Sequence, residues 1–238
     1  AILAKNEQLR ANLLRAISHD LRTPLTSISG NAGVLLASDV TLPAEKRHQL
    51  YESIYDDSLW LINLVENLLS VTRIEDGSMS LRLKPELMDD IIAEALRHLN
   101  RQKSEHPLLV TQGDELALAK VDARLIVQVV INIVDNAIKY TPPGAAIQIV
   151  TTVTKTQVVV EISDNGPGIA EDEKPRIFDM FYTVGAKVAD SRRSLGLGLA
   201  LCKSIINAHG GEIFVLDHQP HGTTFRFTLP KEEVTLHE

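Results

Sequence analysis

Apolar residues recur every three or four positions along two long stretches near the start of the chain, and this period limits the possible folds more than any other feature. The stretches are residues 14–35 and 50–69. Such spacing predicts amphipathic helices, because 3.6 residues per turn place these side chains on one face. Residues 38–44 join the two stretches and contain Pro43, which breaks helices. We therefore expect an antiparallel helical hairpin.

Both apolar stripes are wider than a single hairpin needs. In the second stretch, Leu59, Ile62 and Leu69 widen the main row of apolar residues. Because two helices bury too little surface to be stable alone, this width predicts that two copies pair into a four-helix bundle. Packing against the rest of the same chain is the alternative.

The helical period stops near Asp76, and shorter elements follow. Residues 79–87 alternate apolar and polar side chains and predict a short edge strand interrupted by Pro85. Further strands are predicted at 108–111, 146–153, 157–163, 212–217 and 223–229, and helices at 89–104, 122–140 and 197–208, with Asp122 as the N-cap of the second. The fold class is therefore α+β, with the hairpin followed by a two-layer α/β sandwich. The domain boundary is placed near Gly77.

Composition excludes several classes of protein. The net charge of −7 argues against nonspecific nucleic-acid binding, which needs a clustered basic surface. The one cysteine, Cys202, cannot form an internal disulfide, and its apolar surroundings favour a packing role in a reducing compartment. No run of about 18 apolar residues or signal peptide is visible. Because the chain starts within a helical pattern and without methionine, we expect it to be part of a longer protein.

His19 and Asp20 lie side by side on the polar face of the first predicted helix. At about 100° per residue, His19 lies roughly 200° from both Ile17 and Leu21 on the apolar stripe. Pro24 removes the hydrogen bond to the carbonyl of Asp20 and predicts a bend beside the histidine. A nucleophile next to a carboxylate at such a bend is a candidate reaction centre. A solvated pair is the alternative.

The predicted helix 122–140 carries a polar stripe. The spacing places these side chains on one face: Gln128, Asn132, Asn136, Lys139 and Tyr140. Asparagine is a poor helix former, so two in mid-helix point to a role. A carboxamide oxygen suits Mg²⁺, and a lysine one turn later suits phosphate. An ordinary exposed polar face remains the alternative.

Two glycine-rich segments complete the candidate site. Asp164 ends a predicted strand and precedes Gly166 and Gly168, which allow close backbone approach, while its carboxylate can accept a hydrogen bond from an amino group. A hairpin turn is less favoured, because no alternating strand follows. Gly196 and Gly198 open an apolar helix whose first amides can bind phosphate.

Neither segment forms a known dinucleotide or P-loop fingerprint, so a nucleotide pocket here is of another kind. Between the two segments, residues 185–193 resemble a mobile lid, and Lys187, Arg192 and Arg193 could meet phosphates there. Thr223 starts the last strand, where its hydroxyl could reach the pocket floor.

Taken in order, the motifs His-Asp-x-x-x-Pro, Asn-x-x-x-Asn, Asp-x-Gly-x-Gly, Phe-x-x-Phe and Gly-x-Gly resemble the cytoplasmic core of two-component sensor histidine kinases. The resemblance covers essentially the whole chain. It implies a dimerisation and histidine phosphotransfer domain at 1–76 and a GHKL-type ATP-binding domain at 80–238. The sequence around His19 is most similar to that of the potassium-responsive sensor kinases.

The resemblance also implies a role for each motif residue. His19 would be the phosphoacceptor, Asp20 a general base, and Thr23 would orient water for phosphatase activity. Asn136 would coordinate Mg²⁺, and Asp164 would hold the adenine amino group of ATP. The other nucleotide-binding positions would be Asn132, Lys139, Tyr140, Gly166, Gly168, Gly196, Gly198 and Thr223, with Phe178 and Phe181 in the lid. Ser194 departs from the family, which usually has glycine there.

The implied activity is autophosphorylation of His19 by ATP and Mg²⁺, followed by transfer to an aspartate on a response-regulator receiver domain. The implied protein is a homodimer through residues 1–76 and binds no nucleic acid. The chain would be the cytoplasmic domain of a bacterial sensor that is anchored in the membrane by segments outside this chain. Two rivals remain. One is an ATPase of the gyrase or Hsp90 type, which hydrolyses ATP with a water and does not use His19. The other is a non-enzymatic dimeric scaffold whose nucleotide pocket is inactive.

Overall fold

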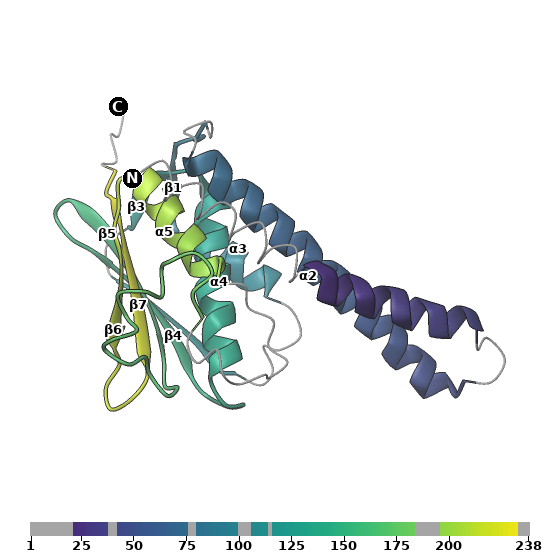
Figure 1. Ribbon diagram of the computed structural model, residues 1–238. Helices are drawn as coiled ribbons and strands as arrows, with labels where there is room; N and C mark the ends of the chain where they lie inside the picture. The colour runs from purple at the N-terminus through teal and green to yellow at the C-terminus, as the bar shows by residue number, and fades with distance from the viewer. Residues whose placement is uncertain are drawn as a thin grey trace. The chain divides into compact units, whose positions relative to one another are not determined.

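The computed structural model describes residues 21–37, 42–75, 80–99, 106–113, 116–183 and 196–232 (Figure 1). Predictions for His19, Asp20, Ser194 and the lid cations at 187, 192 and 193 lie outside these residues. The chain divides into two compact units after Leu68, and each unit is described by itself. None of the described helices combines the length and apolar character needed to cross a membrane.

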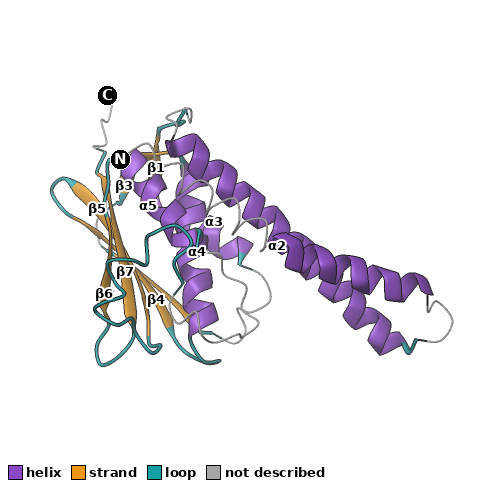
Figure 2. Cartoon of the chain, in the orientation of Figure 1, coloured by secondary structure: helices purple, strands orange, loops and turns teal. Residues whose placement is uncertain are grey.

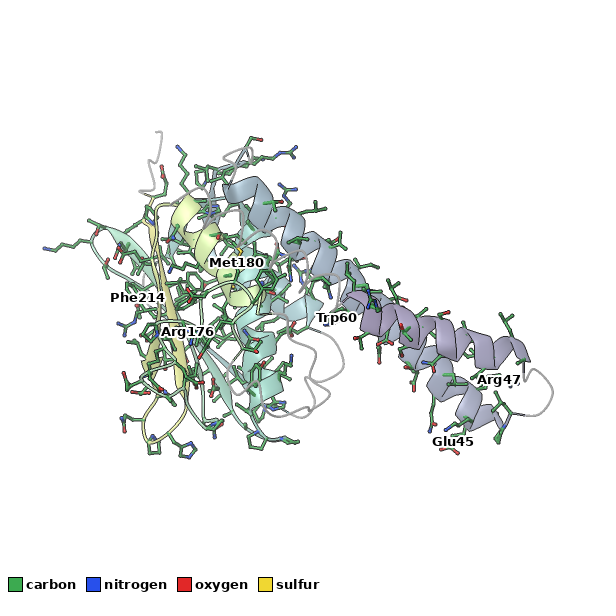
Figure 3. The ribbon with its side chains drawn as sticks, viewed as in Figure 1. Glu45, Arg47, Trp60, Arg176, Met180 and Phe214 are labelled. Carbon is green, nitrogen blue, oxygen red and sulfur yellow. The ribbon has the colours of Figure 1, made fainter. Side chains whose placement is uncertain are left out.

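The first unit contains two helices, as predicted from the apolar period. A helix over residues 21–37 is followed by α2 (Ala44–Glu75), which carries Glu45, Arg47 and Trp60 (Figures 1 and 3). Asn31 of the first helix donates a hydrogen bond from Nδ2 to Ser53 Oγ of α2 at 3.0 Å. This bond joins the two helices side by side.

Many large apolar side chains of this hairpin stay exposed within one chain. Leu64 is buried, yet the following are 38–64% exposed: Leu25, Val34, Tyr51, Tyr55, Leu59, Ile62 and Val65. The wide stripe predicted for residues 50–69 therefore has more apolar surface than the single hairpin covers.

The second unit is built on a mixed five-stranded sheet (Figure 2). Its strands are β2 (Leu108–Gln112), β4 (Ile147–Val153), β5 (Gln157–Asp164), β7 (Thr223–Pro230) and β6 (Ile213–Asp217), in that spatial order. Only the β2–β4 pair of this sheet is parallel. A smaller antiparallel pair joins β1 (Lys84–Leu87) to β3 (Leu118–Val121).

Three helices cover one face of the sheet: α3 (Met88–His98), α4 (Ala123–Tyr140) and α5 (Gly198–Ala208) (Figure 1). Alternate strand residues such as Ile149, Ile162 and Phe227 are buried against the apolar faces of these helices. Burial of an apolar side chain of this size contributes roughly 1.5–3 kcal/mol, so the helix–sheet layer dominates the stability of this unit. The predicted α+β two-layer sandwich is confirmed.

The structure differs from the expected elements in four places, the first of which is that the edge strand expected over residues 79–87 begins only at Lys84. Strand β3 was not predicted, because its four residues are too few to establish an alternation. The predicted helix 89–104 ends at His98, and residues 100–105 are outside the described part. Asp122 does precede α4 as its N-cap, but its side chain makes no capping hydrogen bond.

Candidate functional site

Asp164 is the last residue of β5 and lies buried, 7% exposed, at one end of the sheet. Its Oδ1 accepts hydrogen bonds from the backbone N–H of Gly166 at 2.8 Å and of Thr223 at 3.3 Å. Thr223 is also its register partner across the β5–β7 ladder. Both bonds go to Oδ1, so the carboxylate is held in a fixed orientation with Oδ2 available as an acceptor for a ligand.

Glycines let the backbone close around this carboxylate. A side chain at Gly166 would meet Thr141 Cγ2 at 2.8 Å and Asp164 Oδ1 at 2.9 Å, so the loop after β5 packs directly on the end of α4. Gly222 has a φ of +127°, and a Cβ there would overlap the carbonyl of Asp164. These contacts explain why glycine is needed at the two positions.

Burial raises the pKa of Asp164 above its ordinary value, and the hydrogen bonds from Gly166 and Thr223 only partly oppose that rise. An ionised carboxylate in such a place is costly unless a ligand supplies a further donor. A buried carboxyl group with a raised pKa beside close-packed glycine backbone is a candidate binding group.

Helix α4 presents the predicted polar residues beside this loop. Asn132, Asn136 and Lys139 are half-buried, and Tyr140 is 46% exposed with the Lys139 ammonium 5.5 Å from its ring centroid. The Asn132 side chain interacts with the Cys202 thiol of α5, and its buried Nδ2 has no nitrogen or oxygen acceptor among the described residues. A buried unpaired amide is rare in proteins, and its usual explanation is a ligand or water that completes the bonding.

The start of α5 lies against the same asparagine. A Cβ built on Gly198 would come 3.9 Å from Asn132 Oδ1, so the first residue of α5 lies close to the side chain of Asn132. Leu197, just before the helix, is buried and fixes its start. A helix N-terminus beside a carboxamide side chain can hold anionic oxygens.

The segment after Gly168 forms consecutive turns over residues 171–181 rather than a strand. It is held to the sheet by Phe178, whose ring packs edge-on to Phe225 at 6.4 Å, and by Lys174, whose Nζ lies 2.8 Å from Asp217 Oδ2. The Arg176 guanidinium lies over the Tyr182 ring, 4.3 Å from its centroid. Arg176 and Met180 of this segment are labelled in Figure 3.

The described residues that flank the predicted lid on either side meet in the structure. The N–H of Phe181 donates to the carbonyl of Gly196 at 3.0 Å, and both residues have φ of +64°. A side chain at Gly196 would come within 2.8 Å of the Phe181 carbonyl carbon and still closer to Tyr182. The described residues at 181–183 and 196–198 thus form a tight base, which requires glycine at 196.

The structure brings the predicted residues together in two groups within the second unit. One group lies where β5 ends and β7 begins, and it contains Asp164, Gly166, Gly168 and Thr223. The other lies where α4 meets the start of α5, and it contains Asn132 and Gly198. Thr141, which touches Gly166, connects the groups, because it directly follows α4. Thr23 lies in the other unit, exposed on the helix 21–37.

Sequence reasoning did not single out every residue that shapes the site. Gly222 was assigned no role, although its position before Thr223 in a Gly-Thr pair was a usable signal. His209 and Asp122 form a buried hydrogen bond that no pattern indicated, since they are 87 residues apart.

These groups fit a purine nucleotide with its metal ion. A buried acceptor at Asp164 suits an exocyclic amino group, and the unpaired Asn132 amide with the start of α5 suits phosphate oxygens. Asn136 offers a neutral oxygen ligand of the kind that Mg²⁺ accepts when phosphates and water fill its other positions.

Comparison with protein families assigns most of the chain to two models. Residues 9–77 match the His Kinase A (phospho-acceptor) domain, and residues 121–233 match the histidine kinase-, DNA gyrase B- and HSP90-like ATPase. The second match contains both groups, Asp164 with Thr223 and Asn132 with Gly198, as well as Asn136.

Curated relatives are similar along almost the whole chain. The sensor protein KdpD of Clostridium acetobutylicum is 43% identical over 228 residues, covering 96% of this chain and 25% of the relative. KdpD of Escherichia coli (strain K12) is 34% identical over 232 residues, with 96% and 25% covered. The chain therefore spans about a quarter of the length of these relatives.

Solved structures have the same architecture. The histidine kinase AdeS of Acinetobacter baumannii is 27% identical with a TM-score of 0.70, over 90% of this chain and 98% of that one. The histidine kinase ThkA, solved in complex with response regulator protein TrrA, is 24% identical with a TM-score of 0.69, over 96% and 64% of the two chains, which shows a shared fold.

Proposed function

Because the chain belongs to the sensor histidine kinases, we propose that it phosphorylates its own His19 with ATP and passes the phosphoryl group to an aspartate of a response regulator. The observation that carries the proposal is the buried Asp164 carboxylate, oriented by two backbone amides on Oδ1. Such an acceptor distinguishes an adenine from a guanine at the exocyclic position, because the guanine carbonyl there cannot donate.

In the proposed reaction a neutral ring nitrogen of His19 attacks the γ-phosphorus of ATP in line. The new N–P bond forms as the bond to the β–γ bridging oxygen breaks, and ADP leaves with that electron pair. Asp20 accepts a hydrogen bond from the other ring N–H, which fixes the tautomer and stabilises the positive charge on the ring. A bound Mg²⁺ would supply charge neutralisation on the phosphates, and Asn136 would hold it.

The remaining pocket residues position the nucleotide in this proposal. Asn132 and Lys139 meet phosphates, Tyr140 covers the edge of the pocket, and Gly196 and Gly198 allow the phosphates to approach the start of α5. Gly166, Gly168 and Thr223 shape the adenine end. Their support is that Gly198 lies beside Asn132 and that Gly166 packs on the end of α4.

The test is transfer of the γ-phosphoryl group of labelled ATP to the chain in the presence of Mg²⁺. We expect an acid-labile, alkali-stable label that His19→Gln removes completely. His48→Gln is the matched control, because His48 is an exposed histidine of α2, and this variant should label normally. An intact label in His19→Gln contradicts the proposal, while ATP turnover without any labelled protein favours the gyrase-type ATPase.

We also infer a phosphatase activity toward the phosphorylated partner through Thr23. This residue is exposed on its helix, one turn beyond His19 in sequence, and its hydroxyl can orient a water. Thr23→Ala should spare autophosphorylation and slow dephosphorylation of the partner. Thr26→Ala is the control, since the Thr26 hydroxyl already donates to the Arg22 carbonyl at 2.8 Å. Equal loss of both activities in Thr23→Ala would refute a separate role.

The proposed organisation has two domains, and the first extends beyond Leu68 because α2 continues to Glu75. Residues 1–76 form the dimerisation and phosphotransfer domain, and residues 80–238 form the ATP-binding domain. The exposed apolar side chains of the hairpin support a homodimer, and the ThkA–TrrA complex supports a response-regulator receiver domain as partner. By its likeness to KdpD, we place the chain on the cytoplasmic side of a membrane-bound sensor.

A further inference from the structure

Helices α4 and α5 pack through a shared apolar core, and three contacts mark successive levels along their length. Gly198, at the start of α5, lies beside Asn132, and the Cys202 thiol lies 3.8 Å from the carbonyl oxygen of Val129. At the far end, His209, which caps the C-terminus of α5, meets Asp122, which precedes α4. The order of these contacts shows that the two helices run antiparallel.

The contact between His209 and Asp122 is a directed hydrogen bond. The backbone N–H of Asp122 donates to His209 Nε2 at 3.1 Å, while Nδ1 lies 2.8 Å from the carbonyl oxygen of Ile205. Because Nε2 must be an acceptor, the proton sits on Nδ1 and the ring is neutral. Both residues are buried, at 6% and 4% exposure. Loss of this acceptor would leave a buried N–H unpaired.

The same aspartate holds two further groups. Its Oδ2 accepts hydrogen bonds from the backbone N–H of Arg82 and from the Arg124 guanidinium, both at 3.2 Å. Burial acts to raise the pKa of Asp122, but these partners outweigh it and the pKa lies below its ordinary value. Asp122 is therefore held in place by these hydrogen bonds, and His209 is hydrogen-bonded to its backbone N–H.

We propose that His209 is a positioning residue that sets the lengthwise register of α5 on α4, and thereby the distance between the first amides of α5 and the asparagines of α4. At 1.5 Å per residue, Asn132 lies about 15 Å along α4 from Asp122, and Gly198 lies about 16 Å along α5 from His209. Two stiff helices transmit a shift at one end to the other. This inference rests on the proposed function, in which both groups bind the nucleotide.

The other two contacts cannot set this register. The Cys202 thiol is a weak donor at a long distance, and even a Cβ added to Gly198 would only reach van der Waals distance of Asn132. Packed apolar surfaces alone tolerate small sliding of helices. Among the three contacts, only the imidazole bond has the length and direction that fix a position.

The test compares two substitutions that each keep one half of the imidazole. His209→Gln can place Oε1 near the position of Nε2 and keep an acceptor for Asp122, whereas His209→Asn keeps only the donor near Nδ1. Titration of the full chain with a non-hydrolysable ATP analogue and Mg²⁺, well below the melting temperature, should show about tenfold weaker binding for the Asn variant and less than about twofold for Gln.

A second measurement is independent of nucleotide binding. In the nucleotide-free protein, the amide resonances of Gly198 and Asn132 should shift in His209→Asn and stay near wild type in His209→Gln. Unchanged resonances at these distant amides, or equal affinities of the two variants, would overturn the positioning role. Failure of the wild type to bind the analogue would instead contradict the proposed function, and the resonances would still decide the inference.

Discussion

At Asp164, the burial that suits ligand binding also lowers the stability of the folded protein at neutral pH. Its pKa is raised by burial, so the folded state holds the proton more tightly than the unfolded chain does. For such a group the favourable contribution to stability is present at low pH and is lost as the pH rises through the folded-state pKa. At neutral pH the ionised carboxylate therefore costs free energy, which a bound amino group offsets.

Asp164→Asn should separate these two effects. Asparagine can keep Oδ1 as the acceptor for Gly166 and Thr223, so the fold should be retained, with equal or higher stability near pH 7 in urea unfolding. The NH₂ group of asparagine then takes the place of the second carboxylate oxygen, so it faces the amino group of the bound adenine, which is also a donor. Binding of the ATP analogue by calorimetry should weaken at least about 100-fold, since an unpaired donor on each side adds to the lost bond.

Asp56→Asn is the control for this substitution, because Asp56 is exposed on α2. It should leave nucleotide binding unchanged. Retained affinity in Asp164→Asn would mean that this carboxylate does not contact the base.

At the scale of elements, the strands and long helices were predictable because their signals are local. Alternation over seven or eight residues in β4 and β5 and the apolar face of α4 are each contained in one segment. β3 was missed, because its burial comes from pairing with β1, more than 30 residues earlier. The Asn132 and Asp164 positions were predictable from motifs, but the Asp122–His209 bond depends on tertiary contact alone.

The base of the lid gives a prediction at this scale. Gly196→Ala places a Cβ against the backbone of Phe181 and Tyr182 at a φ of +64°. The strain of about 1–3 kcal/mol should break the Phe181–Gly196 bond and separate the two ends of the lid. Affinity for the ATP analogue should fall roughly tenfold or more.

Gly33→Ala is the matched control, since nothing lies within 4 Å of a Cβ at that helical position. Because alanine favours a helix over glycine, it should leave nucleotide binding unchanged and stabilise the hairpin by up to about 1 kcal/mol. Equal affinities of the two glycine variants would show that the lid base is not needed for binding.

At the scale of the whole molecule, the exposed apolar side chains of the hairpin predict the assembly. Ile62 is 53% exposed and Leu69 is 47% exposed within one chain. Ile62→Glu would bury an unpaired charge in a four-helix bundle, and we expect the dimer to weaken at least about 100-fold in sedimentation equilibrium. The ATP-binding unit should keep its affinity.

Asn63→Glu adds the same charge at the neighbouring exposed residue and should leave the dimer intact. Dissociation by both variants would indicate a general charge effect, and dissociation by neither would place the dimer interface elsewhere.

The pairing of Asp164 with Thr223 also bears on how the molecule folds. The hydrogen bond between them spans 59 positions of the chain, a segment that includes α5 and β6. Closing such a loop carries an entropic cost before any contact compensates it, so this part of the sheet should form late. ATP added during refolding would then bind only chains that have closed the loop, which makes the nucleotide a probe of the last folding step.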